Sequence, residues 1–286
     1  MKLTLLSVPI GNLGDITQRV LEVLKTKKNF IVEDTRSFKN LMQHLKIDTS
    51  EKEIYAFHDH SAPQELDRLT RLMKEQQEVY FVSEAGSPII SDPAYPLVIR
   101  AIENGISVDS CPGPSSILVA LELSGLPPHP FCFHGFIARE NKDKEYLVQK
   151  ILQINQSSSC THILFESPFR ILDTLDFLYK TIPTSIEVKI CLATELTKMY
   201  QRVERFFLSD WETVKPKINA QGEFILMIYI DKLEPTSLLI HNEKEIIELA
   251  QNILENGNRP KSVAKLIAKI LNEDISQVYQ KLNREN

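Results

Sequence analysis

The chain has 286 residues, of which 43% are apolar, and its formal net charge at pH 7 is −5. This size allows a large core divided over two or three domains. The negative balance argues against a surface coated in positive charge, so a nucleic-acid partner would need a local basic patch. Apolar runs stay short of the roughly 20 residues that span a bilayer, and the first ends too early for a signal peptide, so we expect a cytoplasmic protein.

Cysteine spacing gives no sign of a metal site or a disulfide scaffold. Cys111, Cys132, Cys160 and Cys191 lie far apart, without a CxxC pair or a His/Cys cluster of the kind typical of a zinc motif. Structural zinc sites and disulfide-rich domains have ligands at short, regular spacings. We therefore expect no metal and no disulfide framework.

Short β-branched and aromatic runs alternate with amphipathic segments in the first part of the chain, which is typical of α/β architecture. Strands are expected over residues 3–8, 29–34, 53–58, 78–82 and 106–111. Helices are expected over 16–25 with Asp15 as cap, around Phe38 and Met42, and from Pro63 onward. This pattern predicts a mostly parallel sheet in a first domain, residues 1–113.

The rhythm changes after Pro114. A helix over 115–125 leads into a second α/β domain, residues 114–232, whose sheet we expect to be mixed. Its expected strands span residues 130–136, 161–167, 187–196, 204–210 and 223–231. A C-terminal helical domain, residues 233–286, follows, with apolar stripes over 244–254, 261–271 and 275–282.

Polar or Gly/Pro-rich loops follow all five strands of the first domain. They are "PIGNLGD", "EDTR", "HDHS", "SEAGSPIISDP" and "PGPSS". Open α/β enzymes bind ligands at the carboxyl ends of their strands, so five such loops together predict a ligand cleft. The first loop lacks the third glycine of a dinucleotide fingerprint and begins with Pro9, although Glu33 and Asp34 stand where a ribose-binding acid would lie. A nicotinamide enzyme therefore stays open as an alternative.

The segments "SVPIGNLGDITQRVLEVLK", "VEDTR", "SEAGSPIISDP", "PGPSS", "FESPFR" and "ATELTK" occur in an order and spacing that resemble the ribosomal RNA small subunit methyltransferase I family. That family belongs to the tetrapyrrole-methylase-like (class III) S-adenosylmethionine methyltransferases. The resemblance runs from about residue 3 to 230, and the helical tail has its counterpart. It implies two α/β domains with a cofactor cleft between them, and a cytoplasmic homodimer. It also implies 2′-O-methylation of a cytidine ribose in the decoding region of 16S rRNA.

The resemblance also implies which residues hold S-adenosyl-L-methionine. By motif matching they are Pro9, Gly11, Gly14, Glu84, Ser87, Ile89, Ile90, Ser115, Ser116, Ile117, Leu164 and Gly222. Glycines suit such a site because they let main chain approach a ligand or a second segment closely. The chain departs from the family in "SEAGSP" for "SDAGTP", "DPAYP" for "DPGYR" and "HDHS" for "HEHN". These departures concern the acid at Glu84 and the substrate contacts.

Methyl transfer to a ribose oxygen needs orientation, exclusion of water and a proton acceptor, but no metal. Side chains in strand-end loops are the candidate bases: Asp15, Asp34, His58, His60 and Glu166. Several of them have a simpler interpretation as well. Asp15 and Asp34 can cap helices or lie in solvated turns, and His58 can be a surface imidazole.

Several cations are candidates for binding RNA. Arg36 can hold a phosphate or pair with Asp34, and Arg170 near a helix start should answer to an anion: Glu166, Glu195 or RNA. Lys198 follows the last of the resembling motifs. A lysine row at i, i+4 and i+8 stands in the tail and can equally be a solvated helix face: Lys261, Lys265 and Lys269. Rival functions are a same-fold methylase acting on a small molecule such as a tetrapyrrole, a nicotinamide enzyme, and a cofactor-binding protein without turnover.

Overall fold

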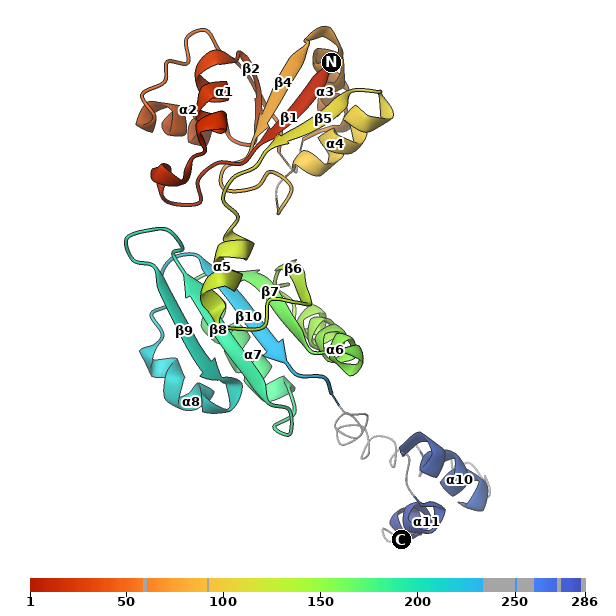
Figure 1. Ribbon diagram of the computed structural model, residues 1–286. Helices are drawn as coiled ribbons and strands as arrows, with labels where there is room; N and C mark the ends of the chain where they lie inside the picture. Colours follow the sequence, from red (N-terminus) through yellow and green to blue (C-terminus); the bar gives the residue numbers. More distant parts are fainter. Residues whose placement is uncertain (59–60, 92, 234–249, 251–259, 272–273, 284–286) are drawn as a thin grey trace.

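The computed structural model describes residues 1–58, 61–91, 93–233, 250, 260–271 and 274–283. It has two sheets, which Figure 1 shows one above the other, and a helical part near the C-terminus. The predicted α/β class is therefore confirmed. The described residues include no helix that is both long and apolar enough to cross a membrane.

The first sheet has strand order β3-β2-β4-β1-β5, and all four pairings are parallel. Its strands are β1 (Lys2–Leu6), β2 (Asn29–Val32), β3 (Glu53–Ala56), β4 (Glu78–Val82) and β5 (Ser107–Cys111). Its helices are α1 (Gln18–Thr26), α2 (Thr35–His44), α3 (Pro63–Glu75) and α4 (Ala94–Glu103). Strand residues alternate between two cores: Tyr80 and Val82 pack with α1 and α2, and Val79 and Phe81 with α3 and α4. Both faces are thus covered, as parallel sheets require (Figure 1).

Two local expectations for this part need correction. Thr17, not Asp15, caps α1 by accepting a hydrogen bond from the Val20 N–H (3.3 Å), so the helix starts at Gln18. Residues Leu13–Asp15 form the 3-10 turn η1, which Asn12 caps. The helix α4 was not predicted, and its segment contains Pro96, a residue that breaks helices when it stands in their interior. In the structure Pro96 stands in the first turn, where its missing N–H is not needed.

The second sheet is mixed, with order β6-β7-β10-β8-β9; β6 and β7 are parallel and the other pairs antiparallel. Its strands are β6 (Phe131–Phe136), β7 (Cys160–Glu166), β8 (Val188–Thr194), β9 (Arg202–Phe207) and β10 (Phe224–Ile230). The predicted helix α5 (Ser116–Ser124) packs on one face. The opposite face carries α6 (Asn141–Ser157), which was not predicted, and α7 (Ile171–Thr181), whose start was expected near Arg170. The short elements η2 (Leu208–Asp210), α8 (Trp211–Val214) and η3 (Lys215–Lys217) follow β9.

Near the C-terminus, α10 (Pro260–Leu271) packs against α11 (Ile275–Asn283). Their contact is apolar and includes Val263, Ala264 and Ile267 of α10 and Val278 and Leu282 of α11. The expected helix over 244–254 lies outside the described residues, apart from residue 250.

Candidate functional site

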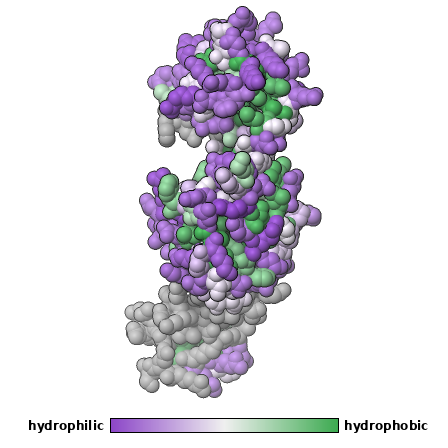
Figure 2. Space-filling view, turned by 90° about the vertical axis from the view of Figure 1, so that its left-hand side faces the viewer, coloured by the Kyte–Doolittle hydropathy of each residue, from purple (hydrophilic) through white to green (hydrophobic). Residues whose placement is uncertain are grey.

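A cleft of about 460 Å³ lies where loops of the first sheet face loops and strand ends of the second. Figure 2 shows the waist of the molecule between these two parts. The volume is in the range of small-molecule and cofactor sites. The cleft is built from the carboxyl ends of β2 and β4, the start of α5, the ends of β6 and β7, and the start of β10. Its position agrees with the rule that open α/β sheets bind ligands beyond the carboxyl ends of their strands.

Six of the predicted cofactor-binding and catalytic residues line this cleft. They are Glu84, Ser87, Ile90, Ser115, Ser116 and Glu166. The loops "SEAGSPII" and "PGPSS" therefore come together, as expected for loops that follow β4 and β5, the two strands that flank β1 in one parallel sheet.

One wall of the cleft is acidic. Glu33 and Glu84 both line it, and the Glu84 N–H donates a hydrogen bond to Glu33 Oε2 (3.3 Å). Partial burial raises the pKa of Glu84, and the negative charges of Glu33 and Asp34 raise it further. Two carboxyl groups at one wall favour a ligand with positive charge.

A second wall is the N-terminus of α5. Ser115 is the cap residue, and its side chain accepts no hydrogen bond from the first turn. The N–H groups of a first helical turn lack partners within the helix and point outward, which favours an anionic group of a ligand. The cleft therefore offers an anion-binding end close to its acidic wall.

The remaining wall comes from the second sheet and is largely apolar. Phe136 and Phe165 meet edge to face with their ring centroids 5.3 Å apart, and both line the cleft. Leu196 and Ile225 lie beside them. Sequence reasoning did not single out these four residues. One signal could have identified Phe165: it is the first residue of the motif "FESPFR" and lies just before the end of a strand.

Gly11 and Gly222 lie directly against the loop after β8. This loop has positive φ at Glu195 (52°) and Thr197 (64°). A Cβ on Gly11 would lie 2.8 Å from Thr197 Oγ1, and one on Gly222 would lie 2.5 Å from Glu195 Cγ. The two glycines therefore make room for a crossing segment, and the cleft-lining residue between these contacts is Leu196.

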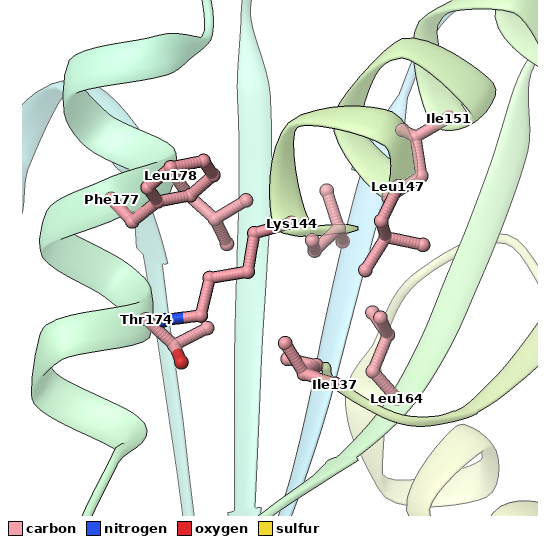
Figure 3. Close-up of a pocket in the computed structure, with 9 residues that line it drawn as sticks. Ile137, Lys144, Leu147, Ile151, Leu164, Thr174, Phe177 and Leu178 are labelled. Carbon is pink, nitrogen blue, oxygen red and sulfur yellow. The ribbon is translucent and has the colours of Figure 1, made fainter. Parts of the chain in front are cut away.

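Other predicted cofactor residues lie around the cleft without lining it. Gly14 is exposed in the η1 turn, and Ile89 is 39% exposed. Pro9 does not line the cleft, whereas the next residue, Ile10, does. Ile117 is buried on the face of α5 that packs on the second sheet. The side chain of Leu164 points to the opposite face of the sheet, because neighbouring strand residues alternate. Figure 3 shows it among Ile137, Leu147 and Ile151.

Glu166 lines the cleft but its carboxylate is occupied. Oε1 accepts hydrogen bonds from the Ser167 N–H (2.7 Å) and pairs with Arg170 (2.6 Å), and Oε2 accepts from Thr174 Oγ1 (2.7 Å). The residue is only 2% exposed. Glu166 is therefore the anion that forms an ion pair with Arg170, and this pairing disfavours Glu166 as a base.

The other candidate bases lie elsewhere. Asp34 caps α2 by accepting from the N–H groups of Arg36 (2.7 Å) and Ser37 (2.9 Å), and these bonds lower its pKa. His58 is exposed, and its backbone N–H donates a hydrogen bond to Ser61 Oγ (2.9 Å). Asp15 is exposed at the end of η1. His60 lies outside the described residues.

Three of the six predicted RNA-binding cations are paired with acids: Arg36, Arg170 and Lys198. Arg36 reaches Asp34 (3.3 Å) but remains 89% exposed. Lys198 bridges Glu195 (3.1 Å) and Glu223 (3.0 Å). Desolvation lowers the pKa of Lys198, but the hydrogen bonds to Glu223 and Glu195 outweigh it, so the pKa is raised. In α10, Lys261 and Lys265 are exposed, whereas the Lys269 side chain lies outside the described residues.

The two-sheet fold and its cleft are those of a known class of enzymes, the tetrapyrrole methylases. The family model for Tetrapyrrole (Corrin/Porphyrin) Methylases matches residues 2–212. Diphthine synthase has a similar structure, with a TM-score of 0.61 at 15% identity over 81% of this chain and 90% of that one. The uroporphyrin-III C-methyltransferase of Thermus thermophilus, solved with S-adenosylhomocysteine, gives a TM-score of 0.52 at 14% identity, covering 80% and 97%.

Sequence comparison narrows the class. A ribosomal RNA small subunit methyltransferase I of Hydrogenobaculum sp. (strain Y04AAS1) is 35% identical over 229 residues, which are 80% of this chain and 95% of that protein. The chain belongs to the ribosomal RNA small subunit methyltransferase I family, within the tetrapyrrole methylases.

Proposed function

We propose that this protein uses S-adenosyl-L-methionine to methylate the ribose 2′-oxygen of a cytidine in the 16S rRNA of the small ribosomal subunit. The observation that carries the proposal is the cleft of about 460 Å³, in which an acidic wall, a helix N-terminus and an aromatic wall converge. Membership of the rRNA methyltransferase family supports an RNA substrate. The S-adenosylhomocysteine held by a structural neighbour supports the cofactor.

The walls of the cleft suit the proposed cofactor chemically. S-adenosylmethionine, when bound, supplies a methyl group carried on a positively charged sulfur. Glu33 and Glu84 can stabilise that positive charge, and the first turn of α5 at Ser115 and Ser116 can receive a carboxylate. The rings of Phe136 and Phe165 can cover a flat base.

We propose Glu84 as the proton acceptor for the ribose hydroxyl. Among the acids singled out from the sequence, it is the one that lines the cleft, carries a raised pKa and is not held by an arginine. A higher pKa makes a carboxylate a better base, because base strength is matched to the proton that it accepts. The cleft walls also exclude water on several sides, which strengthens the interaction of that charge with substrate.

A methylation assay with alternative acceptors tests the proposal. The protein would be incubated with methyl-labelled S-adenosylmethionine and, in parallel, undermethylated 30S subunits or a uroporphyrinogen. We expect label in 16S rRNA, at a cytidine whose 3′ phosphodiester bond then resists alkaline hydrolysis. Label only in the tetrapyrrole would establish the small-molecule alternative, and no label on RNA would overturn the proposal.

A pair of variants connects this activity to the cleft. Ser87→Tyr puts a ring into the lining of the cleft, whereas Ser209→Tyr puts the same ring on an exposed turn. We expect loss of methylation in the first variant and full activity in the second. Equal activity of the two would separate the reaction from this cleft.

A further inference from the structure

The second sheet contains a repeated Cys-X-His pattern on two paired strands. Cys132 and His134 stand in β6, and Cys160 and His162 stand in β7. The strands run parallel with Cys132 opposite His162. Because side chains two residues apart point to the same face, all four side chains share one face of this strand pair.

Three of these residues bring metal-ligating atoms together. The sulfur atoms of Cys132 and Cys160 and a ring nitrogen of His162 all lie within 4.8 Å of one another. His134 Nε2 lies 2.9 Å from His162 Nδ1. In a tetrahedral zinc site, Zn–S bonds of about 2.3 Å and Zn–N bonds of about 2.0 Å place ligand atoms roughly 3.3–3.8 Å apart. The cluster thus needs to contract by about 1 Å, which side-chain rotation can provide.

Asn155 of α6 orients the ring of His162. The amide Nδ2 of Asn155 donates to the carbonyl oxygen of Ile230 (2.6 Å), so its Oδ1 must be the atom that faces His162 Nε2 (2.7 Å). His162 therefore carries its proton on Nε2, and the electron pair of Nδ1 accepts a hydrogen bond from His134 Nε2, which a bound metal ion would replace. A hydrogen bond from the second ring nitrogen to a fixed acceptor is the usual support of a metal-binding histidine.

Side chains at this site are shielded from solvent. Cys160 and His162 are 1% and 0% exposed, and Asn155 is 0% exposed. A zinc ion with two thiolates and two neutral imidazoles has no net charge, which suits a buried site.

We propose that Cys132, Cys160 and His162 bind a zinc ion between the β6–β7 edge of the second sheet and α6. His134, whose Nε2 lies 2.9 Å from His162 Nδ1, can supply the fourth ligand. Binding converts the two thiols to thiolates, so two protons pass to solvent for each zinc ion bound. Sulfur and imidazole ligands favour zinc over magnesium or calcium, which prefer oxygen.

The proposed site has a structural role. The strand β6 lies at the edge of the sheet and pairs with β7 alone, and its last residue, Phe136, lines the cleft. An ion held by both strands and supported from α6 would fix β6 against its neighbours. Its occupancy should therefore change stability without taking part in methyl transfer.

Metal binding by the full-length protein tests the proposal. Reduced protein would be stripped with a chelator and titrated with Zn²⁺, and in a parallel sample with Co²⁺. We expect one equivalent of zinc, two protons released, a higher midpoint of thermal unfolding, and thiolate-to-cobalt charge-transfer absorption. Cys132→Ser, at a half-buried edge position, should abolish the charge-transfer pattern of two thiolates and weaken zinc binding at least tenfold.

Control variants separate this site from general thiol chemistry. Cys191→Ser and Cys111→Ser remove buried cysteines outside the cluster, and both should bind zinc as the unaltered protein does. Asn155→Ala leaves all ligands in place and should weaken zinc binding about 10- to 100-fold. Zinc uptake unaffected by Cys132→Ser, or a Cys132–Cys160 disulfide in place of any metal uptake, would overturn the proposal. Since every readout is of metal binding or stability and none is of methyl transfer, the outcome is independent of the methylation assay.

Discussion

Gly11 faces the backbone of Leu196 so closely that a Cβ on Gly11 would lie 3.0 Å from the Leu196 carbonyl oxygen. The next residue, Asn12, donates its N–H to Thr197 Oγ1 (3.1 Å). These contacts join the loop after β1 in the first sheet to the loop after β8 in the second. They hold Leu196 at the wall of the cleft.

We expect Gly11→Val to displace the loop that carries Leu196. Overpacking of this kind costs about 1–3 kcal/mol, and a cost of that size taken from binding weakens it roughly 5- to 150-fold. Isothermal titration with S-adenosylmethionine measures the loss, with circular dichroism as the check of folding. Gly14→Ala is the matched control, since its Cβ meets only the Asn12 side chain. Unchanged affinity in Gly11→Val would show that this junction does not shape the cleft.

Arg170→Ala should destabilise the fold. The variant leaves the buried Glu166 carboxylate without its cation, and losing one partner of a buried pair costs about 3 kcal/mol. Urea unfolding measures the change. Arg36→Ala removes an exposed cation from Asp34 and should cost under about 1 kcal/mol. Equal losses in the two variants would mean that the Glu166 pair is no stronger than a surface pair.

Glu84→Gln should reduce methyl transfer while preserving the cleft. Loss of a general base typically lowers the rate about 10²- to 10⁴-fold. Single-turnover methylation of 30S subunits measures this effect. Binding of the neutral product S-adenosylhomocysteine should stay within about twofold, because the substitution removes charge and little volume. A variant that keeps its rate would exclude Glu84 as the base.

The same residue makes the reaction and the stability depend on pH. The pKa of Glu84 is raised by partial burial and by Glu33 and Asp34, so the methylation rate should fall on the acid side at a pH above the ordinary carboxyl range. Because the pKa of Glu84 is higher in the folded state than in the unfolded state, folding favours the protonated carboxyl. The protein is therefore most stable below the unfolded-state pKa, and this stability is lost as pH rises through the folded-state pKa. Glu84→Gln should therefore gain stability relative to the unaltered protein as pH rises through that window, which urea unfolding at several pH values can measure.

The exposed lysines of α10 should contribute to ribosome binding. Replacing Lys261 and Lys265 by Gln should lower the slope of log affinity against log salt concentration by about 1 for each phosphate that the variant no longer binds. The measurement is binding to 30S subunits at several salt concentrations. Gln at Lys25 and Lys39, which are exposed on α1 and α2, provides a charge-matched control. Identical slopes for both double variants would leave α10 without an RNA-binding role.

The sequence by itself determined the ten strands, the helices α1–α3 and α5, and the collection of loops at one edge of the first sheet. These features depend on neighbours within a few residues: alternation, caps and the turn residues that end a strand. The approach of Glu84 to Ser115 also followed from the sequence, since parallel strands carry their carboxyl ends to the same edge. The helices α4 and α6 were missed, and of α7 only the start near Arg170 was expected; α4 carries a proline in its first turn.

Only the tertiary structure decided which groups are free to act. Glu166 looked like a base at a strand end, yet Arg170 and Thr174 occupy its carboxylate. Cys132 and His162 are separated by 30 positions of chain and become neighbours only through the register of β6 and β7. Strand register and the packing of helices on a sheet depend on the whole core and not on local pattern. For that reason the sequence could place the cleft, but not the partners of the side chains around it.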